Sequence, residues 1–190
     1  DTAAMLRRLV ETLDARPDAD IVHADFTLID ENGAETGRSR VGPIDRLLFG
    51  NNIGACFLYR ACVTEALGGY DVGLFGVEDY DFWLRAAQKF AFVTLNEDLY
   101  LYRKHGGSLT SQRGDQIQDL TARIVERSLP DTLSPRRRSE ILLGLVLRSH
   151  WRWRGDLVRR AFRADPWHVA ARAPALARWW IIVARNRLTS

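Results

Sequence analysis

The residues best suited to chemistry are three carboxylates in the stretch GLFGVEDYDFWLRAA, residues 73–87. Glu78, Asp79 and Asp81 lie within four positions, directly after a loop with two glycines and a phenylalanine. Apolar side chains follow at helical spacing, so the pattern predicts a helix that begins at the acids. Acids in a first turn complement the helix dipole and cap its free N–H groups. Three acids exceed what capping needs, and a glycine-containing loop is typical of a binding site, so the cluster is a candidate for catalysis.

The elements that must position this cluster alternate between helix and strand. The spacing of leucine and valine over 6–13 predicts an amphipathic helix that ends at Pro17. The second expected strand contains Gly54, at a point where a side chain would obstruct a neighbour. The elements expected after the first helix are a strand over 19–30, a short helix over 43–48, a strand over 51–60, a helix over 61–69, and strands over 91–95 and 99–105.

From residue 113 onward the pattern is helical throughout. Helices are expected over 113–128, 135–149, 151–164 and 166–187. Alternating elements followed by helices predict an α/β fold, with a mixed sheet and flanking helices over residues 1–112. An all-helical region is expected over 113–190.

The composition divides the chain in a similar way. The 46% hydrophobic content and the net charge of +3 are typical of a globular protein and exclude a disordered one. Residues 136–190 carry 13 arginines against 3 acids, whereas residues 1–135 carry 14 basic and 21 acidic residues. Two cysteines exclude a disulfide framework or a zinc motif and favour a reducing, cytoplasmic compartment. The longest uncharged apolar run, 179–184, is too short to span a bilayer, and no secretory signal is visible.

Three segments together carry a resemblance to a known family: DADIVHADFTLIDENG, NNIGACFLYRACVTEALGGYDVGLFGVEDYDFWLRAA and LYLYRKHGGSLT. Their order and spacing resemble the second half of family 2 glycosyltransferases with the GT-A fold, over about residues 1–110. Four segments occur in that family in the same order. The first is a strand of small residues with an arginine, and the second is a GGyD motif. The third is an ED pair followed by D.WLR, and the fourth is Y.YR.H..S, where each dot stands for any residue. The resemblance implies a partial GT-A-like, Rossmann-like sheet. It also implies inverting transfer of a sugar from a nucleotide-sugar donor to a hydroxyl acceptor.

The resemblance gives Asp79 the role of general base, with Glu78 as its partner. One carboxylate suffices on the acceptor side, because the hydroxyl proton leaves as the new bond forms. The start of a helix would keep Asp79 ionised. Trp83 and Arg85 are expected to orient the helix, while Asp81 is either a supporting acid or a solvated one.

Substrate contacts are implied at two other segments. Asn52, Gly54 and Ala55 match the segment where donor or acceptor approaches the backbone, although tight sheet packing would also require small residues there. Arg103 and His105 match the segment near the diphosphate, where arginine binds phosphate and histidine donates to phosphate or ligates the metal. The alternative for His105 is a histidine at a strand end that lies on the surface or only supports the residues that touch the ligand. The remaining implied contact is at Ser108.

A divalent cation, Mg²⁺ or Mn²⁺, is the implied cofactor, since the leaving diphosphate needs positive charge. The family holds this metal mainly through an acidic motif in its first half, and the present sequence begins with a helix that resembles the one after that motif. We therefore expect this chain to be the acceptor-side half of a longer enzyme. The isolated chain should be inactive and the full-length protein active. The implied partners are a nucleotide-sugar donor and a glycan or lipid-linked acceptor.

The last 40 residues hold five of the six tryptophans, interleaved with arginines. Three interpretations remain: packing on the α/β core, peripheral contact through 136–190 with the inner face of the plasma membrane, or nucleic-acid binding. Nucleic acid is not expected, because no recognised motif accompanies the tryptophans.

Two other functional classes compete with sugar transfer. In the first, the chain is a non-catalytic docking module whose basic helices bind a membrane surface or a protein. In the second, the clustered acids serve metal-assisted hydrolysis, which the lack of a histidine cluster disfavours.

Overall fold

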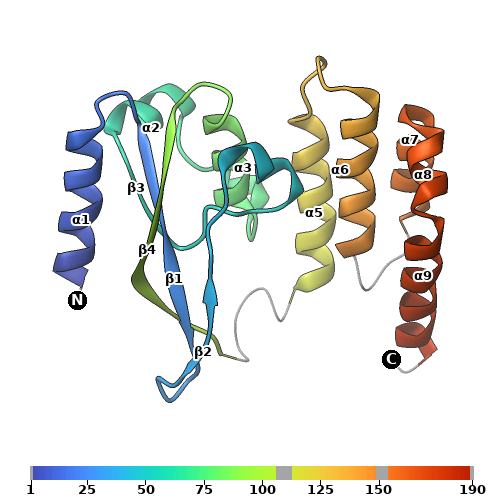
Figure 1. Ribbon diagram of the computed structural model, residues 1–190, viewed down its shortest axis with the longest axis horizontal. Helices are drawn as coiled ribbons and strands as arrows, with labels where there is room; N and C mark the ends of the chain where they lie inside the picture. The colour runs from blue at the N-terminus through green and yellow to red at the C-terminus, as the bar shows by residue number, and fades with distance from the viewer. Residues whose placement is uncertain (1, 106–112, 149–153, 189–190) are drawn as a thin grey trace. The chain divides into compact units, whose positions relative to one another are not determined.

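The chain forms two compact units, Asp1–Gly114 and Asp115–Ser190. The computed structural model describes residues 2–105, 113–148 and 154–188. The first unit combines a sheet with helices, and the second is helical in the part that is described (Figure 1). The predicted α/β class, with a mixed sheet, flanking helices and helices toward the C-terminus, is therefore confirmed. The boundary was expected after residue 112, and the observed division follows Gly114.

The sheet of the first unit is built around β1 (Ile21–Ile29). β4 (Phe92–Arg103) pairs with β1 in parallel, whereas β2 (Glu35–Ser39) and β3 (Cys56–Tyr59) pair with it antiparallel. β3 pairs with the first half of β1 and β2 with the second half, so these two short strands share one edge. β1 thus has neighbours on both sides, and all its residues except Leu28 are buried.

β4 corrects one expectation from the sequence. The segments 91–95 and 99–105 were expected to be two strands separated by Asn96, Glu97 and Asp98. They form one strand, which shifts register against β1 between the pairs Ala24↔Leu95 and Asp25↔Asp98. The extra residues bulge out of the ladder while pairing continues on both sides. Arg8 of the first helix binds the bulged Glu97 at 2.6 Å.

Helices cover both faces of this sheet (Figure 1). α1 (Thr2–Ala15) packs Leu9 and Leu13 against Val22, Ala24 and Cys56. Side chains alternate along a strand, so Phe57 and Tyr59 face the other way, toward α3 (Glu78–Ala86). The Phe57 ring lies 4.7 Å from the Trp83 ring, edge to face. The shorter elements between β2 and α3 are η1 (Ile44–Phe49), α2 (Ala61–Leu67) and η2 (Val72–Leu74).

The second unit contains α5 (Gly114–Arg127), α6 (Pro135–Arg148), α7 (Gly155–Ala164), α8 (Pro166–Ala171) and α9 (Ala173–Leu188). The single helix expected over 166–187 is two helices, α8 and α9, separated at Arg172. Asp165 caps α8 by accepting the His168 N–H at 2.9 Å, and Pro166 occupies the first turn. His168 is itself buried, with its Nδ1 3.0 Å from the Ser139 hydroxyl of α6.

Candidate functional site

A pocket of about 540 Å³ lies in the first unit. Its volume is in the range that binds small ligands. Its wall combines aromatic side chains with a few polar groups. The described lining residues are Phe26, Leu28, Ser39, Asn51, Gly54, Ala55, Phe57, Asp79, Tyr102 and Lys104.

Strand pairing brings one wall of the pocket together. Phe26 of β1 pairs with Ser39 of β2, and Leu28 of β1 pairs with Tyr102 of β4. Directly paired residues present their side chains on the same face of a sheet. Lys104 follows β4 and extends its ladder, because its N–H donates to the Ile29 carbonyl at 2.8 Å. Residues from all four strands therefore meet the loop before β3 and the start of α3 around one hollow.

Asp79 is the carboxylate of this pocket. Its Oδ2 accepts a hydrogen bond from the Asn51 Nδ2 at 3.0 Å, and its Oδ1 accepts the Tyr80 N–H at 2.6 Å. Burial raises the pKa of Asp79 above its usual value, and the neighbouring Glu78 charge adds to the rise, whereas the two hydrogen bonds oppose it. A desolvated carboxylate that still faces a pocket is suited to accept a proton from a bound ligand.

The other two acids of the cluster do not line the pocket. The Glu78 carboxylate turns back and accepts the N–H of Gly76, whose φ of 92° requires glycine. Glu78, expected as the partner of the base, therefore holds the loop before α3. The sequence predicts either a supporting or a solvated role for Asp81, and the structure excludes the solvated alternative because Asp81 is 1% exposed.

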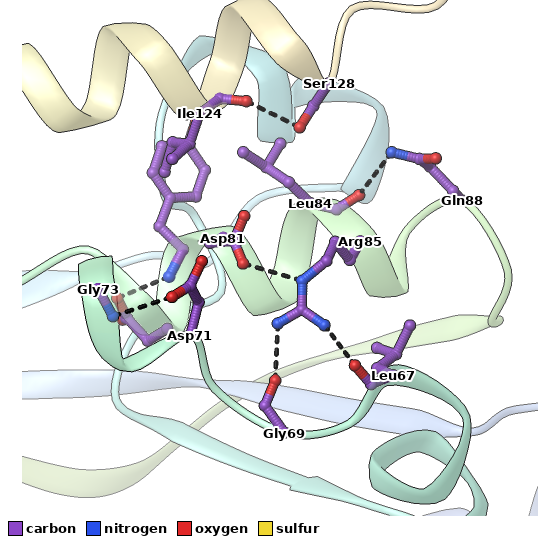
Figure 2. A network of polar contacts seen from close by, with 12 residues as sticks. Leu67, Gly69, Asp71, Gly73, Asp81, Leu84, Arg85, Gln88, Ile124 and Ser128 are labelled. Atoms are coloured by element: carbon purple, nitrogen blue, oxygen red, sulfur yellow. Dashed lines mark hydrogen bonds and ion pairs between the residues drawn. The ribbon is translucent and has the colours of Figure 1, made fainter. Parts of the chain in front are cut away.

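Asp81 and Arg85 instead fix the position of α3 (Figure 2). The Arg85 Nε donates to Asp81 at 2.8 Å. The same guanidinium donates to the carbonyls of Leu67 at 2.8 Å and Gly69 at 2.7 Å. Arg85 thus ties α3 to the end of α2, which agrees with the expectation that it orients the helix.

Gly54 and Ala55 line the pocket as the sequence indicated, and the reason for glycine is visible. Gly54 has a φ of 78°, and a Cβ built on it would lie 2.4 Å from the Cε1 of Phe26. The Phe26 ring therefore packs directly on the Gly54 backbone. Asn52 was expected at the site but is absent from the described lining. Its amide donates to the Pro43 carbonyl at 2.8 Å, and its neighbour Asn51 occupies the pocket instead.

The segment after β4 also differs from the expectation by one position. Arg103, expected to bind phosphate, is absent from the described lining and donates to the carbonyls of Asp30 at 2.9 Å and Glu31 at 2.7 Å. Strand alternation instead turns Tyr102 and Lys104 to the pocket. His105 is exposed and is absent from the described lining. Ser108 lies outside the described residues.

Two ionisable residues of β1 are buried beneath the surface of the sheet, Asp25 and His23. Asp25 accepts the Val41 N–H at 2.8 Å and pairs with Arg40 at 2.6 Å, which anchors the chain just beyond Ser39. His23 lies two residues earlier, and its Nε2 is 3.0 Å from the Thr94 hydroxyl. Burial lowers the pKa of His23 to about 4, so the imidazole is neutral at neutral pH.

The residues that are described offer no cluster of three or more histidine, cysteine, aspartate or glutamate side chains fit to hold a metal ion. The expected metal role of His105 therefore finds no supporting ligands in this part of the chain.

Comparison with known proteins adds no family to these observations. No protein-family model matches the chain, and no curated protein sequence shows significant similarity to it. Among the described helices, none is both long enough and apolar enough to cross a bilayer.

Proposed function

We propose that this pocket is the acceptor side of an inverting glycosyltransferase with a GT-A-like fold. The observation that carries the proposal is Asp79, a carboxylate with a raised pKa that opens into a ligand-sized pocket beside Asn51. The order of the three sequence segments that resemble family 2 glycosyltransferases supports the same function. The aromatic wall suits a sugar, whose ring presents C–H groups on one side and hydroxyls at its edge.

In the proposed reaction, a hydroxyl of the acceptor lies within hydrogen-bond reach of the Asp79 carboxylate. Its oxygen forms a bond to the anomeric carbon of the donor sugar while the bond from that carbon to the diphosphate breaks. The proton passes to Asp79, and the bonding electrons leave with the nucleoside diphosphate. Asn51 holds the carboxylate in place through its 3.0 Å hydrogen bond. No step is assigned to a cation, because the described residues supply no group of ligands for one.

The direct test is donor turnover by the full-length gene product. The protein would be incubated with a panel of nucleotide-sugar donors and glycan or lipid-linked acceptors, and released nucleoside diphosphate would be measured. The proposal expects release that depends on the acceptor for at least one donor. It expects none from the 190-residue chain alone, because the donor-binding residues of the family lie outside the segment it resembles. Turnover by the chain alone, or none by the full-length protein, would argue against it.

The second unit supports a second candidate function, docking on an anionic membrane surface at the cytoplasmic side. Trp167 is 85% exposed, and Trp180 and Ile181 of α9 are 55% and 61% exposed. The arginine excess of residues 136–190 provides charge that anionic headgroups attract. Tryptophan and isoleucine on a basic helix are typical of helices that lie in the interface.

Vesicle flotation tests this second candidate. Docking predicts that the chain floats with phosphatidylglycerol vesicles at low salt, much less at high salt, and not with phosphatidylcholine vesicles. Replacing Trp180 and Ile181 with serine should reduce flotation, while replacing Leu6 and Val10, exposed apolar residues of α1, should not. Flotation that is insensitive to the α9 change, or a shift of single-stranded nucleic acid instead, would rule against membrane docking.

A further inference from the structure

Two charges of opposite sign line the pocket without neutralising each other. Asp79 and Lys104 are the charged residues of its described lining. They form no ion pair with one another within 4.0 Å, and among the residues that the structure describes Lys104 has no ion-pair partner. An ammonium group in the wall of a pocket, without a carboxylate partner among the described residues, is free to bind an anion from a ligand.

The rest of the wall indicates what kind of ligand carries this anion. The Phe26 and Tyr102 rings lie 5.9 Å apart with their planes inclined at 53°, and Phe57 adds a third ring. These rings offer an apolar surface next to the polar groups of Asn51 and Asp79. A pyranose with an acidic substituent matches all three parts, because it has a C–H face, free hydroxyls and a negative charge.

We infer that the acceptor is a sugar that bears an anionic group, a carboxylate or a phosphate, which Lys104 binds while a free hydroxyl meets Asp79. This inference rests on the proposed function, because it assigns Asp79 to the acceptor hydroxyl. The diphosphate of the donor is the other source of an anion, and a comparison of an acidic sugar with uridine diphosphate separates the two. Lys104 is exposed, so its contribution to affinity should be about tenfold and not more.

Lysine labelling can test this inference, because Lys89 and Lys104 are the only lysines of the sequence. Reductive methylation with ¹³C-formaldehyde keeps the positive charge and gives each lysine, and the terminal amine, a separate NMR signal. The three ligands would be methyl glucuronide, methyl glucoside and uridine diphosphate. Lys89 lies just beyond α3, is not among the described residues that line the pocket, and serves as the internal control.

We expect methyl glucuronide to move the Lys104 signal and not the Lys89 signal. It should bind about tenfold more tightly than methyl glucoside. The Lys104→Met variant should lose this preference, and Lys89→Met should keep it.

Three results would overturn the inference. They are equal binding of the acidic and the neutral sugar, binding of neither, or a Lys104 shift that only uridine diphosphate produces. Equal binding would leave the proposed function in place, because the turnover assay with the full-length protein judges that function separately.

Discussion

Replacing Gly54 with alanine tests the geometry of the pocket most sharply. The φ of 78° at Gly54 is one that other residues adopt at a cost of about 1–2 kcal/mol. The new Cβ would also lie 2.4 Å from the Phe26 ring, which is 8% exposed and packed within the pocket wall. Overpacking of this kind costs about 1–3 kcal/mol. We therefore expect Gly54→Ala to destabilise the first unit by about 3 kcal/mol.

Gly68 provides a matched control for the backbone contribution. It has a φ of 74°, and a Cβ added there would meet nothing within 4 Å, so Gly68→Ala carries the strain without the clash. The stabilisation that alanine gains from a less flexible unfolded chain is common to both variants and cancels in the comparison. The difference between the two variants, about 1–3 kcal/mol, is the contribution of the Phe26 contact.

Hydrogen exchange of the slowest β1 amides reports the stability of the first unit separately from the second. A double variant, Gly54→Ala with Phe26→Leu, should recover at least about 1 kcal/mol relative to the sum of the single changes, because the ring that clashes is gone. The close contact between Gly54 and Phe26 would be disproved if Gly54→Ala destabilises the first unit no more than Gly68→Ala does. It would also be disproved if the effects of Gly54→Ala and Phe26→Leu are additive in the double variant.

Three further predictions follow from the buried groups. The folded-state pKa of His23, about 4, lies below the unfolded value of 6.5, so the first unit should lose about 3 kcal/mol as the pH falls from 6.5 to 4. The His23→Gln variant should lose much less, as β1 exchange measured at several pH values would show; equal losses would contradict this role of His23. Arg85→Met removes one charged partner of buried Asp81, together with two hydrogen bonds to carbonyls at the end of α2, and should destabilise the first unit by about 3 kcal/mol, with partial recovery in the double variant with Asp81→Asn. Lack of any coupling between these two changes would disprove the tie between α3 and α2. Because burial raises the pKa of Asp79, sugar transfer should fall on acidification through a pKa above the ordinary aspartate value, and an acid limb below that value would exclude Asp79 as the base.

Much of the architecture could be predicted from sequence because its signals are local. Apolar spacing located α1, and β-branched and aromatic runs located β1, β3 and both ends of β4. The bulge at Glu97 could not be predicted, since Asn96, Glu97 and Asp98 form a run of turn residues and the parallel pairing that spans them is long-range. Strand β2 was missed because Glu35–Ser39 is polar, and pairing with β1, not burial, makes it a strand.

The candidate site was predictable to within one residue at two of its segments. The sequence indicated Asp79 through the acid cluster and the family resemblance, and Gly54 as a position where a side chain would obstruct a neighbour; both line the pocket. It chose Asn52 over Asn51 and Arg103 over Lys104, because the choice depends on which way a strand or loop presents its side chains. Side chains two positions apart on an extended segment face the same way. Lys104 lies two positions after Tyr102, so this alternation could have indicated Lys104 in place of Arg103.

The proposed function depends on Asp79 as the proton acceptor, and a single substitution probes that role. Asp79→Asn in the full-length gene product keeps the size of the side chain but removes its capacity to accept a proton from a hydroxyl. We expect nucleotide-sugar turnover to fall by about 10²–10⁴-fold, the usual contribution of a general base, while exchange of the β1 amides shows that the first unit remains folded. Turnover within a few-fold of the unmodified protein, with that unit intact, would contradict that role.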